Sequence, residues 1–81
     1  MRWVSNYKHP EGWTFEIESE ILFDLNTKEN VTFFNLLVMD ANGEEIRDYL
    51  QEALDIAQDQ AFEDFGVPLD SWVEAPESEE K

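Results

Sequence analysis

The chain has 81 residues, and its 20 Asp and Glu against five Lys and Arg give a formal net charge of −15. This length suits one small domain, and such a charge repels nucleic acids and anionic membranes, so we expect neither as a direct partner. The absence of cysteine excludes disulfides and thiolate metal sites, and 14% aromatic residues argue against an intrinsically disordered chain.

The first half of the chain has the pattern of β-strands. A run rich in β-forming residues occupies positions 2–7, and a turn signal with Pro10 and Gly12 follows it. Between residues 13 and 25 apolar residues occupy six of the odd positions, which predicts a long strand with one wet face. Only Ser19 interrupts this series, and we expect a bend or bulge there.

The next strand, at 31–40, is apolar on both faces. Its odd-numbered side carries Val31, Phe33, Leu37 and Met39, and its even-numbered side carries Phe34, Leu36 and Val38. One side is expected to pack in the core. The other is either covered by another element or offered to a partner.

The second half is typical of a helix. Asn42 and Glu45 match a variant of the capping box, and apolar residues then recur at three- and four-residue steps. Gly66 suits the left-handed position after a helix, and Pro68 prevents continuation. The pattern predicts one long amphipathic helix that ends at residue 65.

These elements predict an α+β fold. We expect a three-stranded antiparallel sheet in β-β-β-α order, with the long helix packed on one face and meeting the odd-numbered side of the strand at 31–40. Trp72 and Val73 are expected to fold back as a short turn. Residues 1–75 would form a single domain, and 76–81 a disordered acidic tail.

The acidic residues form two regular rows. Glu16, Glu18 and Glu20 alternate along one side of a strand, about 6.6 Å apart. A second row follows the predicted helix at intervals of about 4.5 to 6 Å and consists of Asp48, Glu52, Asp55, Asp59 and Glu63. Arg47 is the only base in that helix, so little offsets the repulsion between like charges. We predict that these eight residues bind the partner, the helix row being favoured for its charge density.

In size, acidity and element order the chain resembles the small acidic inhibitors encoded by phages and mobile elements, which include DNA mimics and anti-CRISPR proteins. That resemblance implies a non-catalytic protein that occupies a basic, nucleic-acid-binding protein surface. Regular carboxylates can present a phosphate-like ladder to Lys and Arg of such a partner. No leader-like apolar segment and no run of roughly 20 apolar residues is present in the sequence. This favours a location in the cytoplasm, or in the cytoplasm of the host cell if the protein is encoded by a phage.

An alternative interpretation is a structural or assembly subunit. Here the apolar face of Phe34, Leu36 and Val38 would form the interface, including that of a homodimer, and the acids would serve solubility or a salty environment. Trp3 and Trp72 either pack over the core or anchor a partner.

Catalysis and metal binding receive little support. The segment beginning at Asp40 resembles a calcium loop, but Gly43 falls at its fourth position and Gln51 at its twelfth, where an EF-hand requires Gly at the sixth and Glu at the twelfth. His9 is the sole histidine and lies in a Pro-containing turn, a poor setting for a nucleophile relay. We expect no enzyme, no metal and no cofactor.

Overall fold

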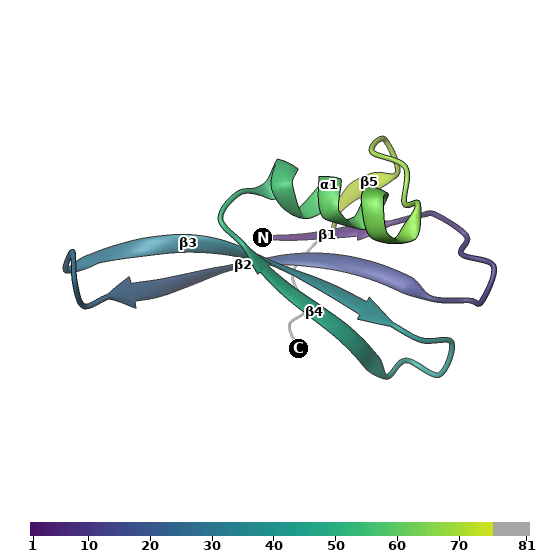
Figure 1. Cartoon of the computed structure of the whole chain (residues 1–81), viewed down its shortest axis with the longest axis horizontal. Helices are drawn as coiled ribbons and strands as arrows, with labels where there is room; N and C mark the ends of the chain where they lie inside the picture. The colour runs from purple at the N-terminus through teal and green to yellow at the C-terminus, as the bar shows by residue number, and fades with distance from the viewer. Residues whose placement is uncertain (76–81) are drawn as a thin grey trace.

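A computed structural model describes residues 1–75 as five antiparallel strands with one helix across one face of the sheet (Figure 1). The strands are β1 (Arg2–Ser5), β2 (Thr14–Asp24), β3 (Glu29–Met39), β4 (Glu45–Gln51) and β5 (Trp72–Ala75), and the helix is α1 (Leu54–Phe65). Their order in the sheet is β4-β3-β2-β1-β5. The expected disordered tail, 76–81, lies outside the described residues.

The prediction of a three-stranded sheet with one long helix is therefore wrong. The fold remains α+β, but the segment predicted as the first half of the helix is β4, and α1 has 12 residues. Trp72 and Val73 lie in β5, which pairs with β1, and do not form the expected turn. The pairing of β2 with β3 runs through Ser19 without the expected bulge.

The apparent capping box belongs to the β3–β4 hairpin loop. Asp40 Oδ1 accepts hydrogen bonds from the backbone N–H groups of Asn42, at 2.9 Å, and Glu44, at 3.0 Å. Gly43 has φ +86°, which glycine adopts without strain, and its N–H donates to the Asp40 carbonyl at 2.9 Å. This loop turns the chain back along β3, so residues 45–51 pair as a strand.

The helix begins at Leu54, after the start that the sequence predicts, and ends at the predicted residue, Phe65. Its N-cap residue, Ala53, has an extended backbone, and its side chain cannot donate or accept a capping hydrogen bond. At the other end Gly66 has φ +75°. Its N–H donates to the Phe62 carbonyl at 2.9 Å and the Val67 N–H donates to the Ala61 carbonyl at 3.2 Å, which confirms the predicted end. No helix in the described part of the chain is long and apolar enough to cross a bilayer.

The core lies between α1 and the sheet. Phe15 and Ile17 of β2 stand opposite Val38 and Leu36 of β3, and all four are at most 1% exposed. Ala57 and Ala61 on the helix let it approach closely, and Val67 completes the fully buried set. The even-numbered side of β3 thus meets the helix, which corrects the expectation that the odd-numbered side would. All three tryptophans pack against this core.

Candidate functional site

The exposed side of α1 carries a row of three carboxylates, here called the helix row: Asp55, Asp59 and Glu63. They follow at intervals of four residues, so each lies about 6 Å from the next along the helix axis. All three side chains are exposed, and none of these side chains makes a hydrogen bond or ion pair with another described residue. The helix contains no Lys or Arg. The row is therefore available, as a set of negative charges, to a partner.

Two of the acids on α1 occupy positions that weaken the helix. Glu63 and Asp64 lie in its last turn, next to the negative end of the helix dipole, and no basic residue is present there. The pairs Asp55–Asp59 and Asp59–Glu63 add repulsion of about 0.2–0.5 kcal/mol each. Local stability alone does not explain this placement of charge.

The structure separates the five acidic residues that the sequence predicted on one helix. Asp48 lies on β4 opposite Leu37, which places it on the face of the sheet that α1 leaves uncovered, here called the helix-free face. Glu52 lies in the bend between β4 and α1. Only the last three members of the predicted row share one helix.

Asp48 instead shares the helix-free face with the three glutamates of β2, here called the strand row. Glu16, Glu18 and Glu20 alternate with the buried Phe15 and Ile17 on β2, so they project away from α1. The two candidate surfaces therefore lie on opposite sides of the sheet.

Neighbouring side chains contact two members of the strand row, and one of these contacts is an ion pair. Arg2 Nε lies 3.1 Å from Glu16 Oε1, and Arg2 Nη2 donates to Glu16 Oε2 at 3.3 Å. Glu20 accepts a hydrogen bond from the Asn35 amide at 3.4 Å. All three glutamates are half-buried. The helix row is thus the more accessible and the less compensated of the two.

The predicted apolar interface is placed mainly beneath the helix. Leu36 and Val38 are 0% exposed within the chain itself. Phe34 is half-buried, and its ring lies 5.9 Å from that of Trp3. The described residues themselves thus cover most of this face.

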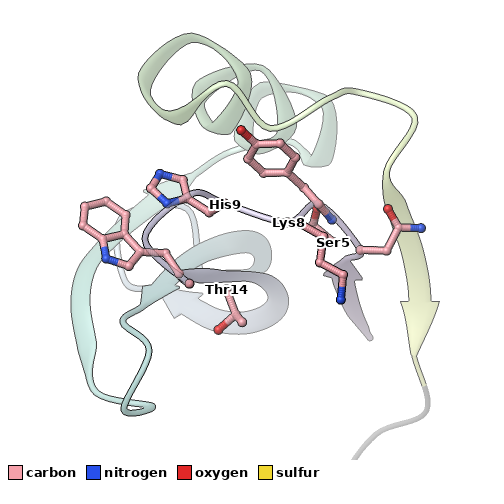
Figure 2. Close-up of a pocket in the computed structure, with 8 residues that line it drawn as sticks. Ser5, Lys8, His9 and Thr14 are labelled. Carbon is pink, nitrogen blue, oxygen red and sulfur yellow. The ribbon is translucent and has the colours of Figure 1, made fainter.

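A shallow hollow of about 410 Å³ lies along the β1–β2 connection, with Ser5, Lys8, His9 and Thr14 around it (Figure 2). The His9 ring stacks on Trp13 at 4.6 Å, and His9 Nδ1 accepts the Glu11 N–H at 3.1 Å. Ser5 Oγ is occupied by a 2.8 Å hydrogen bond with Ser71 Oγ. Its serine and histidine therefore make separate contacts and do not form a nucleophile–base pair.

The loop that resembles a calcium site uses its acid for the backbone. Asp40 Oδ1 accepts the two N–H groups that shape the hairpin, as described above. Within residues 1–75, no three His, Asp or Glu side chains gather closely enough to hold a metal ion. We assign no metal site to the described residues.

Sequence analysis did not identify a projecting hairpin as a functional element. We call residues 20–33 the β2–β3 arm; Figure 1 shows it extending to the left beyond the N-terminal end of α1. Four large apolar side chains on it are 42–78% exposed: Ile21, Leu22, Phe23 and Leu25. The signal in the sequence was this run of apolar residues on both faces of the strand.

No family model matches the chain, and neither the curated proteins nor the solved structures gave a match. The functional conclusion consequently rests on the geometry and charge of the residues described above.

Proposed function

We propose that this protein is a non-catalytic inhibitor or regulator that binds the basic, nucleic-acid-binding surface of another protein, in the manner of a DNA mimic. The observation that carries this proposal is the helix row, Asp55, Asp59 and Glu63, exposed on one helix that has no Lys or Arg. The protein would act in the cytoplasm, where it would meet nucleic-acid-binding proteins.

The spacing of the helix row suits such a partner. Carboxylates about 6 Å apart along one helix form a regular series of negative charges, as the phosphates of a nucleic-acid strand do, and a series of Lys and Arg side chains can recognise either. Because the row is fixed on a folded helix, little ordering is needed when the partner binds. A net charge of −15 also steers a cationic protein toward the chain and accelerates association.

The position of the acids supports recognition over solubility alone. Solubility is served by mixed charges and a net charge of about 2 to 8 in magnitude for a small domain. Here three like charges follow one another on a helix, and Glu63 lies where it opposes the helix dipole. A surface selected only for solubility has no need of that arrangement.

The proposal is tested by capture from native cell extract. The immobilised chain is loaded with extract, and bound proteins are eluted with increasing salt or with duplex DNA. We expect a basic protein that both treatments release, because DNA and the helix row compete for one surface. Release by detergent but not by salt or DNA would instead favour the assembly-subunit interpretation.

A matched pair of variants locates the binding surface. Asp55→Asn, Asp59→Asn and Glu63→Gln together remove three charges from the helix row and are expected to abolish capture. Glu11→Gln, Glu44→Gln and Glu45→Gln remove three exposed charges that lie outside α1 and should leave capture intact. Equal loss in both variants would show that net charge, rather than the helix row, binds the partner.

A further inference from the structure

The β2–β3 arm is a two-stranded ribbon with open edges. β4 pairs with β3 only from Phe34 onward, and β1 pairs with β2 only from Glu16 to Glu18. Among residues 1–75, the segments 20–24 and 29–33 are therefore paired only with each other. Among these residues, neither outer edge has a strand partner for its backbone N–H and C=O groups, and a further strand can bind there.

The arm also exposes apolar side chains on both faces. Ile21 is 70% exposed and Phe23 58%, on the face of the sheet that carries α1, while Leu22, at 42%, lies on the other. In contrast Ile17, on the same strand and the same face as Ile21, is 0% exposed because α1 covers it. An isolated two-stranded ribbon is marginally stable in water, and an open apolar edge is a site for strand addition.

The charge of the arm selects among occupants. Glu20, Asp24 and Glu29 lie on the same two strands as its apolar residues, and Lys28 at the tip is its only base. A second copy of this chain would bring the same carboxylates, and another net charge of −15, against the first. An extended segment with Lys or Arg beside apolar residues would satisfy the edges, the apolar side chains and the charge together.

From these observations we propose that the β2–β3 arm binds an extended, basic and alternately apolar segment of the partner by adding it as a strand. This inference rests on the proposed function for the basic character of the partner. The helix row supplies charge recognition on α1, and the arm supplies main-chain hydrogen bonds and apolar contact beyond the start of that helix (Figure 1).

The test uses synthetic peptides, so that no natural partner is required. A short peptide in which lysine alternates with valine is titrated into the whole chain, and backbone amide shifts are followed by NMR. We expect shifts at residues 20–24 and 29–33. A lysine–serine peptide should bind at least about tenfold more weakly, because it lacks the apolar contacts, and a glutamate–valine peptide should not bind.

Two variants identify the arm as the binding site. Ile21→Thr with Phe23→Thr keeps residues suited to strands and should weaken binding about tenfold or more. The control, Leu69→Thr with Val73→Thr, removes two side chains that are 51% and 52% exposed outside the arm, and should bind as the parent does. Unchanged affinity in the arm variant would overturn the proposal.

A charge-reversal variant distinguishes loss of the binding contacts from loss of the arm structure. Glu20→Lys with Glu29→Lys should transfer the preference from the lysine–valine peptide to the glutamate–valine peptide, with shifts again at residues 20–24 and 29–33, a change of preference that loss of arm structure alone does not produce. Peptide-induced shifts confined to α1 would overturn the proposal. Arm shifts that grow with protein concentration before any peptide is added would assign the arm to a second copy of the chain, and would overturn it too.

The two proposals can fail separately. The peptide titration reads residues 20–33 and does not depend on the helix row, whereas capture from extract is judged on Asp55, Asp59 and Glu63. If only the peptide titration fails, the arm is not part of the interface. If only the capture from extract fails, the helix row is not part of it.

Discussion

Ile46 and Tyr49 are three residues apart on a β-strand, yet both pack against the same core. In a regular strand two residues at this spacing point to opposite faces. The register shift between Val38 and Met39 resolves this, because Val38 pairs with Arg47 and Met39 with Glu45, which leaves Ile46 as an extra residue. The bulge thus gives β4 an apolar spacing that also fits a helix.

Replacing Gly43 with Ala distinguishes the hairpin from the helix that the sequence predicts. In the structure Gly43 has φ +86°, and no atom lies within 4 Å of an added Cβ, so the change strains the backbone without a clash. We expect a loss of about 1 kcal/mol or more in the free energy of unfolding, measured with urea. Within a helix the same change would stabilise by about 1 kcal/mol.

The control at this position is Gly43→Asn. Asparagine tolerates left-handed backbone better than alanine does, so its free energy of unfolding should lie between those of the other two chains. An increase in stability for Gly43→Ala would contradict the hairpin.

Leu36 and Leu37 report which face of β3 lies under α1. Leu36 is 0% exposed on the helix side, whereas Leu37 is half-buried on the helix-free face. We expect Leu36→Ala to lower the free energy of unfolding by about 2–5 kcal/mol, and Leu37→Ala to lower it less. Thermal or urea unfolding monitored by circular dichroism measures both, and the reverse order would mean that the other side of β3 meets the helix.

The ion pair of Arg2 with Glu16 should be visible in a double-mutant cycle. Replacing Arg2 with Met leaves a half-buried carboxylate without its guanidinium, and we expect a loss of about 1 kcal/mol. Glu16→Gln in the same chain should recover part of that loss. A coupling free energy of zero, no different from that between Arg2→Met and the exposed Glu11→Gln, would show that the ion pair contributes nothing.

Removing charge from the last turn of α1 should affect stability and binding in opposite directions. Glu63→Gln relieves repulsion with Asp59 and an unfavourable interaction with the helix dipole, so we expect a gain of about 0.3–1 kcal/mol at low salt. The gain should shrink as salt screens both effects. Capture of the partner should weaken in the same variant, and a chain that is stabilised without any loss of capture would exclude Glu63 from the interface.

Local signals predicted the parts of the fold that local signals control. The two long strands were located within two residues at each end, because the spacing of their apolar residues and the turns between them are explicit. Gly66 and Pro68 likewise marked the helix end. These features depend on neighbours in sequence.

The two strands that the sequence analysis did not predict, β4 and β5, depend on contacts between residues far apart in the sequence. β5 has four residues, and it exists because Trp72–Ala75 pairs with Arg2–Ser5 at the other end of the described chain. β4 was mistaken for helix because a bulge reproduces helical spacing. The prediction of the site was wrong for the same reason. Asp55, Asp59 and Glu63 have the predicted spacing on α1, whereas Asp48 lies on β4, on the opposite face of the sheet. Exposure of the arm depends on where β1 and β4 stop pairing, which no local pattern specifies.

The salt dependence of affinity for the captured partner tests the central claim most directly. It is measured by titration for the parent chain, for the variant neutralised at Asp55, Asp59 and Glu63, and for the control neutralised at Glu11, Glu44 and Glu45. We expect parent and control to lose affinity steeply as salt rises, and the helix variant to bind about tenfold or more weakly with a shallower slope. Identical affinities and slopes for the two variants would contradict recognition through the helix row.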